Sequence, residues 1–302
     1  MSSMMDKLKK NSKIKTAEVL SESKFFTEKD MVTTDVPMVN VALAGSIDGG
    51  VTPGLTVLAG PSKHFKTSFA LLMAGAYLRA KKDAVLLFYD SEFGSPQSYF
   101  EQFGIDTSRV LHTPITNVEE LKFDLVGQLE NIDRKDDVII VIDSIGNLAS
   151  KKELQDAIDE KSVADMSRAK ALKGLFRMCT PYLAMKNIPM LAVNHTYRYV
   201  KEKSKIPISV SWDGGIAKYS GMLDVAVAGG YVAKPSNGWY CAVDRNTGEL
   251  MQPKVREKDT MQEEFWKPIF ASTDLADFIK SQYSIGKAQL VDMEEIVNAV
   301  DE

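Results

Sequence analysis

The sequence predicts an α/β fold with a mainly parallel central sheet, an N-terminal helical arm and a small α/β C-terminal lobe. From Pro37 onward, short runs rich in Val, Ile and Leu alternate with stretches whose apolar residues recur at helical spacing. Near-continuous apolar runs are typical of strands buried on both faces, as in parallel sheets flanked by helices. After Tyr197 the pattern changes to a basic stretch followed by alternating residues. We therefore expect an arm over 1–33, a core over 34–220 and a lobe over 221–302.

Each predicted element follows from a stretch of this pattern. The apolar runs predict core strands at 55–60, 84–90, 138–143 and 190–195. Helical spacing predicts helices at 67–80, 118–132 and 163–184. In the last third of the chain, alternation predicts an antiparallel strand at 208–212, and two short helices are expected near 274–283 and 289–300. The first 30 or so residues are polar, charged and compatible with a helix, which predicts the arm.

Composition limits the classes of protein that fit. The chain has 302 residues, of which 44% are hydrophobic and 26% charged, as expected for a soluble globular protein. It shows no signal peptide and no apolar run long enough to span a bilayer, so we expect no membrane partner and a place in the cytoplasm. Cys179 and Cys241 lie far apart without metal spacing, which suits a reducing compartment. The net charge of −4 excludes a global polycation, so nucleic acid would have to bind at local basic patches.

A phosphate-binding loop is predicted between the first core strand and its helix. Residues 60–67 read GPSKHFKT, which matches the pattern G-x-x-x-x-G-K-[ST] except that Phe65 replaces the second glycine. Lys66 is expected to reach the β- and γ-phosphates of ATP, and the Thr67 hydroxyl to bind Mg²⁺. The expected nucleotide-binding loop consists of Gly60, Pro61, Ser62, Lys63, His64, Phe65, Lys66, Thr67 and Ser68. A chance G-x5-K-T between a strand and a helix is the alternative.

Phe65 needs its own explanation within this loop. Glycine is usual before the lysine because it lets the loop curl tightly around phosphate. We expect the Phe65 ring to point away from the nucleotide, beside the helix or against a neighbouring subunit.

Asp143 ends the third predicted strand, in the run VIIVIDS. Ligands of open α/β sheets bind at the carboxyl ends of the strands, and an aspartate there can hold the water shell of Mg²⁺. The alternative is an aspartate that only caps the next turn. Together with the loop at 60–67, this strand favours ATP and Mg²⁺ as cofactors.

The second strand ends in FYDSEFG, which places two carboxylates at the same edge. Glu92 is expected to orient or deprotonate the water that attacks the γ-phosphate, and Asp90 is the competing candidate. Tyr99 is expected either to cover the adenine or to pack on the sheet. His195 ends the fourth strand on the same rim, where it is either structural or a sensor of the γ-phosphate.

These stretches together resemble the RecA family of recombinases, in particular its phage members. The matching stretches, which follow the family order over nearly the whole chain, are GPSKHFKT, LFYDSEFG, VIDSIGNLASKKE, DMSRAKALKGLFR, NIPMLAVNHTY, DGGIAKYSGMLD and NGWY. Phage members of the family also carry an aromatic residue before the P-loop lysine. The resemblance implies a RecA-like P-loop ATPase core that forms a helical filament on single-stranded DNA and binds ATP between neighbouring subunits.

The resemblance also implies roles for individual residues. Lys66 and Thr67 fall on the Walker A lysine and hydroxyl, and Asp143 on the Walker B aspartate. Glu92 falls on the catalytic glutamate and Tyr99 on the adenine-stacking tyrosine. His195 takes the place of the sensor that couples the γ-phosphate to DNA binding.

The DNA contacts and the arm are likewise implied by the resemblance. Lys151 and Lys152 lie in the segment that corresponds to the first DNA-binding loop, and Arg168 begins the helix after it; they would contact phosphates. A solvated charged face is the alternative for these, and the reading we prefer for Lys170 and Lys173. The arm, with Phe25 and Phe26, resembles the segment that docks on the adjacent core, although Phe26 could equally fasten the arm to its own core.

One junction departs from the family pattern. After NHTY the family continues with a glycine-rich second DNA-binding loop and two further strands, whereas here NHTY at 194–197 runs directly into RYVKEKSK. Arg198 lands on the second member of the basic pair that contacts the neighbour's ATP, while Thr196 takes the first position. Strands cannot leave a sheet without exposing unpaired N–H and C=O groups or forcing residues 208–212 to pair with the remaining strands.

Two functions remain open on this basis. The first is a DNA-dependent ATPase that coats single-stranded DNA and performs homologous pairing and strand exchange, with a phage single-strand-binding protein and a loader as partners. The alternative is a deletion paralogue that binds ATP and joins or regulates recombinase filaments without strand exchange.

Overall fold

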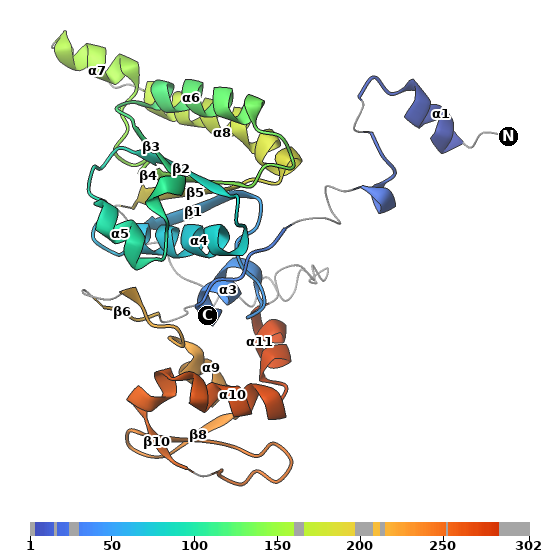
Figure 1. Cartoon of the computed structure of the whole chain (residues 1–302), viewed down its shortest axis with the longest axis vertical. Helices are drawn as coiled ribbons and strands as arrows, with labels where there is room; N and C mark the ends of the chain where they lie inside the picture. Colours follow the sequence, from blue (N-terminus) through green and yellow to red (C-terminus); the bar gives the residue numbers. More distant parts are fainter. Residues whose placement is uncertain are drawn as a thin grey trace, which may run out of the picture. The chain divides into compact units, whose positions relative to one another are not determined.

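The computed structural model of the chain describes residues 4–14, 17–23, 30–159, 166–196, 208–211, 215–251 and 253–283 (Figure 1). Contacts divide the chain into two compact units, Met1–Val32 with Thr52–Tyr199 and Thr33–Val51 with Val200–Glu302. By contacts, residues 33–51 therefore group with the C-terminal residues rather than with the core in which the sequence placed them. Arg198, Phe25, Phe26 and the helix expected near 289–300 lie outside the described residues.

The first unit is built on a five-stranded, all-parallel sheet in the order β1-β5-β4-β2-β3. The strands are β1 (Gly54–Gly60), β2 (Val85–Asp90), β3 (Val110–Pro114), β4 (Val138–Asp143) and β5 (Pro189–His195). The four predicted strands are confirmed within one residue at each end, and β3 is additional. β4 is buried at every position because it lies at the centre of the sheet with helices on both faces.

Helices cover the two faces of this sheet (Figure 1). α6 (Val118–Asn131) and α8 (Ser167–Lys186) pack together on one face, and their apolar residues join those of β2, β4 and β5 in one core cluster. α4 (Lys66–Ala80) covers the other face. α6 begins where the Asn117 side chain accepts a hydrogen bond from the Glu120 N–H, and α8 ends at Asn187 in the left-handed conformation.

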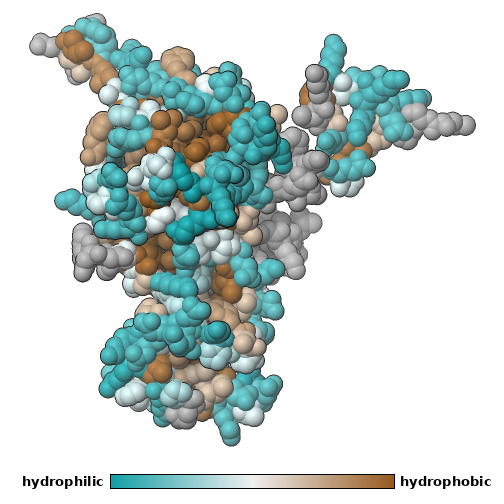
Figure 2. Space-filling view, viewed as in Figure 1, coloured by the Kyte–Doolittle hydropathy of each residue, from teal (hydrophilic) through white to brown (hydrophobic). Residues whose placement is uncertain are grey.

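β1, which carries the phosphate-binding loop, lies at the edge of the sheet. Its composition, GLTVLAG, suits a strand with neighbours on both sides, yet within the described residues it pairs only with β5. Val57, near its centre, is 47% exposed. In the space-filling view, hydrophobic residues gather on this unit beneath α6 and α8 (Figure 2).

The strand expected at 208–212 does not extend this sheet. In the described residues, β6 (Val210–Ser211) pairs antiparallel with β7 (Gly215–Ile216) in a separate two-stranded sheet. Within the part of the chain that the structure describes, β6 is therefore not paired with β1. A two-residue strand would add only a few ladder hydrogen bonds to that edge.

The second unit has its own core and a three-stranded antiparallel sheet in the order β10-β9-β8. Its strands are β8 (Val232–Ser236), β9 (Trp239–Ala242) and β10 (Val255–Arg256). Its helices are α3 (Pro37–Ala44), α9 (Met222–Ala228), α10 (Glu263–Ser272) and α11 (Leu275–Tyr283), of which α11 confirms the prediction near 274–283. Trp266 is buried at its centre and donates from Nε1 to the Thr260 carbonyl.

The remaining described helices are short. α1 (Met4–Asn11) lies in the predicted arm and buries no residue, α5 (Gln97–Gln102) follows β2, and α7 (Lys151–Ile158) follows β4. Among the described helices, none combines the length and hydropathy that a bilayer-spanning segment needs.

Candidate active site

The loop between β1 and α4 has the backbone of a phosphate cradle. Lys63 and Phe65 both adopt positive φ, at 61° and 54°, and α4 begins immediately afterwards at Lys66. The left-handed region is where glycine is favoured, which explains why glycine is usual at the position of Phe65. The loop therefore keeps the curl that the phosphate-binding pattern requires, with the strain borne by a bulky residue.

Lys66 lies at the first turn of α4 and is almost buried, with 9% of its surface exposed. Its ammonium donates to the Pro61 carbonyl at 2.7 Å and to His195 Nδ1 at 3.4 Å. Burial lowers the pKa of Lys66, and the negative charges of Glu92 and Asp143 act against that shift. The ammonium is thus held inside the loop, close to two carboxylates.

Thr67, in the first turn of α4, contacts Asp143 at the end of β4. The Thr67 hydroxyl donates to Asp143 Oδ2 at 2.8 Å, while Oδ1 of the same carboxylate is buried without a hydrogen-bond partner. Desolvation raises the pKa of Asp143 to about 6 despite the bond from Thr67. A buried carboxylate oxygen without a partner, beside a hydroxyl, is an arrangement that a cation would complete.

Glu92 and His195 form the second polar contact of the site. His195 Nε2 donates to Glu92 Oε1 at 2.7 Å, because its Nδ1 already accepts from the Lys66 ammonium. Burial alone would raise the pKa of Glu92. Hydrogen bonds, including the one from His195, and nearby positive charge outweigh this effect and hold the pKa of Glu92 below its usual range. Glu92 is therefore a carboxylate connected through one imidazole to the P-loop lysine.

Asp90 is bound to other partners than Glu92. Its carboxylate is buried and accepts hydrogen bonds from the backbone N–H groups of Glu92 and Phe93 and from the ring of His112. Both carboxylate oxygens of Asp90 are thus bonded to the turn and to β3, whereas the Glu92 carboxylate bonds to His195 and Asn147.

Two residues of the site were not predicted from the sequence. Asn147 donates from Nδ2 to Glu92 Oε1 at 3.2 Å. Gly146 lies so close to His195 that a Cβ added to it would be 2.8 Å from the ring atom Cδ2. Both belong to the stretch SIGNLAS after β4, and their proximity to His195 follows only from the pairing of β4 with β5.

Tyr99 contacts the first turn of α4, where its hydroxyl and the Ser68 hydroxyl are hydrogen-bonded. Its ring meets Phe103 edge-on, with the ring centroids 5.6 Å apart. The side chain thus lies beside the phosphate-binding loop, and its role as the adenine cover stays a prediction.

The residues predicted to contact DNA have different surroundings. Lys151 and Lys152 are exposed at the start of α7, whose first turn is fixed by a capping box between Ser150 and Glu153. Lys152 also pairs with Asp156 at 3.3 Å. Arg168 instead donates to the carbonyls of Ile145, Gly146 and Leu148, at 2.7–2.9 Å.

These contacts give Arg168 a positioning role. Its Nε and Nη2 atoms hold the loop after β4, next to the site, so phosphate contact by Arg168 would compete with these three bonds. The phosphate contacts of Lys151 and Lys152 stay predictions.

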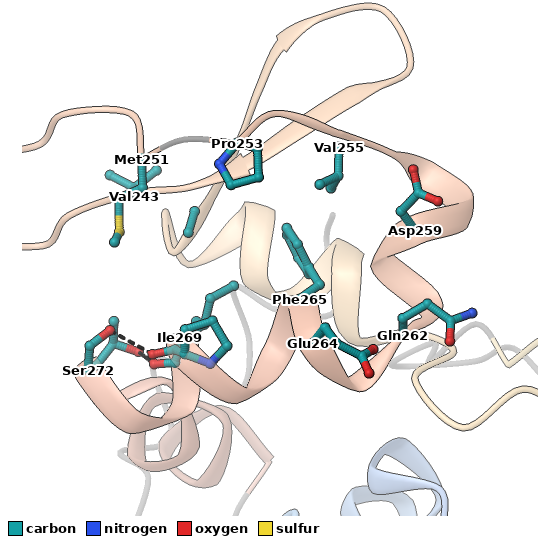
Figure 3. A pocket seen from close by; sticks show the side chains of 13 residues that line it. Val243, Met251, Pro253, Val255, Asp259, Gln262, Glu264, Phe265, Ile269 and Ser272 are labelled. Carbon is teal, nitrogen blue, oxygen red and sulfur yellow. Dashed lines mark hydrogen bonds between the residues drawn. The ribbon is translucent and has the colours of Figure 1, made fainter.

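The second unit carries an apolar pocket of about 400 Å³ between α10 and the segment that links β9 to β10 (Figure 3). Phe265, Pro268 and Ile269 line one side, and Val243, Met251 and Pro253 the other. None of the predicted site residues lines this pocket.

The fold and the site define the class of the protein. A phosphate-binding loop after β1, carboxylates at the ends of β2 and β4, and an all-parallel sheet make this unit a RecA-like P-loop core. The family described as "Bacteriophage T4, Recombination and repair protein, C-terminal domain" matches residues 219–279. The "Recombination and repair protein" of Enterobacteria phage T4 is 44% identical over 357 residues, which cover 100% of this chain and 90% of that protein. The chain belongs to the family of this phage recombination and repair protein, UvsX.

The length of this alignment bears on the junction after NHTY. It extends over 357 residues although the chain has 302, so the phage T4 protein has residues without a counterpart here. This agrees with a missing internal segment, while its position at the junction 197–198 stays a prediction.

Proposed function

We propose that the chain is a DNA-dependent ATPase that assembles as a recombinase filament on single-stranded DNA. The observation that carries the proposal is the convergence of Lys66, Glu92 and His195 at the carboxyl ends of β1, β2 and β5. A lysine in a phosphate-binding loop, joined through an imidazole to a carboxylate, has the parts needed for phosphoryl transfer to water.

Each side chain has a defined task in this proposal. Lys66 exchanges its bonds to Pro61 and His195 for phosphate oxygens when ATP binds. Glu92 orients the attacking water and accepts its proton, and a positioned base of this kind contributes about 10²–10⁴ in rate. His195 loses one partner when Lys66 turns to phosphate and keeps the other, so it is placed to report an occupied site to Glu92.

The residues at Thr67 and Asp143 fit Mg²⁺. A hydroxyl and a carboxylate with one unpartnered oxygen supply hard oxygen ligands, and Mg²⁺ usually takes only one or two protein ligands beside substrate phosphates and water. When bound with ATP, the ion would neutralise phosphate charge. Among the described residues no cluster of three or more His, Cys, Asp or Glu side chains could hold a metal.

The relationship to the phage T4 protein supports filament formation and DNA binding. Within the described residues β3 is an edge strand, and its Leu111 is exposed, as is Phe123 of α6. Exposed apolar residues on an edge strand and on a helix suit contact with a neighbouring copy. Lys151 and Lys152 supply the positive charge for DNA phosphates.

ATP turnover with and without single-stranded DNA tests the proposal. The wild type is expected to hydrolyse ATP faster with DNA, and Lys66→Ala to lose turnover. Lys186→Ala is the matched control, since Lys186 bonds to the carbonyls of Leu129 and Glu130 and not to the loop. If ATP still binds but DNA does not stimulate its turnover, the proposal of a DNA-dependent ATPase is wrong.

That outcome would favour the second candidate, an ATP-binding subunit that joins or regulates filaments without strand exchange. The observation that supports it is the edge position of β1, together with the longer aligned length of the phage T4 protein. Binding of this chain to filaments of that longer relative, without strand exchange by the chain alone, is the result it predicts.

A further inference from the structure

We infer that Asp90 is a positioning residue of the ATPase site, whose carboxylate fixes the turn that carries Glu92. The inference rests on the proposed role of Glu92. Its starting point is that Glu92 lies beyond the end of β2, where strand pairing no longer holds the backbone.

The backbone of Asp90 is rigid because the sheet holds it on both sides. Asp90 pairs with Pro114 of β3 and with Asp143 of β4. Its carbonyl accepts a hydrogen bond from the Ile115 N–H at 2.9 Å. The carboxylate therefore projects from a residue that the sheet fixes, and the next residue, Ser91, is held by its N–H bond to the Asp143 carbonyl at 2.8 Å.

The carboxylate connects this fixed point to the turn. Asp90 Oδ1 accepts from the Glu92 N–H at 2.9 Å and from the Phe93 N–H at 2.7 Å. Only 3% of Asp90 is exposed, and hydrogen bonds to a buried, charged acceptor are stronger than those between neutral groups. Two successive N–H groups on one oxygen fix the direction of the chain between them.

The turn needs this support because its conformation is unfavourable. Phe93 has φ of 55°, in the left-handed region that costs a residue with a side chain about 1–2 kcal/mol. Its side chain is 64% exposed, so packing contributes little to holding it there. The bonds to Asp90 act on the Glu92 and Phe93 amides directly, while the Ser91 hydroxyl fastens the start of the turn to Ser144.

The second carboxylate oxygen of Asp90, Oδ2, bonds to a residue of the neighbouring strand β3. His112 of β3 donates from Nε2 to Asp90 Oδ2 at 3.1 Å, and half of its side chain is exposed. His195 and Asn147 bond to the Glu92 carboxylate itself. The backbone of Glu92 and its carboxylate are therefore positioned by separate groups.

Asp90→Ala tests the inference by ATP turnover and by hydrogen exchange of the Glu92 and Phe93 amides. We expect kcat to fall about tenfold or more while the dissociation constant for ATP changes little, and both amides to lose protection. Asp90→Asn keeps an oxygen that accepts both bonds and should stay within about threefold of the wild type.

Asp106→Ala is the matched control. Asp106 accepts the Ser108 N–H at 2.9 Å in a similar turn, away from Glu92, so its loss should leave kcat unchanged. If Asp90→Ala does not fold, Asp90→Ser takes its place, with a kcat expected between those of the wild type and of Glu92→Gln.

Wild-type kcat and amide protection in Asp90→Ala, or in Asp90→Ser if that variant replaces it, would overturn the inference. Glu92→Gln separates it from the proposed function. If Glu92→Gln turns over ATP like the wild type, Glu92 is not the base, whereas the amide exchange of the Asp90 variants still reports whether Asp90 holds the turn.

Discussion

His195 donates a hydrogen bond to Glu92 at 2.7 Å and accepts one from Lys66 at 3.4 Å, so one imidazole joins the lysine of the phosphate-binding loop to the carboxylate at the end of β2. Its ring therefore needs one donor and one acceptor, on atoms that face in different directions.

His195→Gln should retain most of the activity because an amide also offers one donor and one acceptor. His195→Ala removes both and should lower kcat about tenfold or more, since Glu92 then loses the bond from His195 and keeps the longer one from Asn147. Steady-state ATP turnover of the two variants checks this. Equal loss in both would show that the ring itself, rather than its hydrogen bonds, is required.

Gly146→Ala should displace His195. An added Cβ would lie 2.8 Å from Cδ2 of the His195 ring and 3.2 Å from its backbone nitrogen, closer than atoms pack without movement. We expect kcat to fall with little change in ATP affinity. Gly127→Ala in α6 is the matched control, because a Cβ there meets nothing within 4 Å and alanine favours the helix by about 0.5–1 kcal/mol. Wild-type turnover in Gly146→Ala would contradict the close packing of this loop on His195.

Phe65→Gly should preserve ATP binding. The φ of 54° costs phenylalanine about 1–2 kcal/mol, while glycine adopts it freely but gives the unfolded chain more freedom, so stability should change by less than about 1 kcal/mol. Phe65→Val should weaken both stability and ATP affinity because a β-branched residue resists positive φ. Thermal unfolding and ATP titration of the pair provide the measurement. If the valine variant binds ATP better than the glycine variant, residue 65 does not need the left-handed conformation.

Asp143→Asn should stabilise the metal-free protein at neutral pH. A carboxyl whose pKa rises from 3.8 to about 6 on folding destabilises the folded state once it ionises, by about 3 kcal/mol above pH 6. The cost develops as pH rises from about 4 to 6, and it is absent below that range. Asparagine keeps an acceptor for Thr67 without the charge.

Unfolding of both proteins in EDTA between pH 4.5 and 7.5 measures this difference. The advantage of the variant should shrink as pH is lowered, while its Mg²⁺-dependent turnover should be lost. A constant difference across this range would contradict a raised pKa for Asp143.

The central strands could be predicted because their signal is local. VIIVID of β4 has only apolar residues before its aspartate, and the structure extends it over the predicted residues. β3 was not predicted because VLHTP is short and mixes polar with apolar residues, as an edge strand can. The pairing partner of the strand expected at 208–212 could not be predicted either. Alternation of polar and apolar residues indicates a strand but does not indicate which strand will pair with it.

The site was predictable where each residue has a sequence pattern of its own. Lys66 and Thr67 belong to the recognisable loop pattern after β1, Asp143 ends the apolar run of β4, and their meeting follows from the parallel sheet. Gly146 and Asn147 have no such pattern, because their importance depends on distances to His195 and Glu92 across the sheet.

The choice between Glu92 and Asp90 likewise required the structure. Both residues stand at the end of the same strand, and only their hydrogen-bond partners distinguish them. Asp90 contacts the Glu92 and Phe93 N–H groups and His112, whereas Glu92 contacts His195 and Asn147.

The measurement that tests the central claim most directly is the rate of ATP hydrolysis with and without single-stranded DNA, for the wild type, Lys66→Ala and Lys186→Ala. We predict that DNA stimulates ATP turnover in the wild type and in Lys186→Ala. We predict that Lys66→Ala has lost this turnover. ATP binding without DNA-stimulated turnover in the wild type would contradict it.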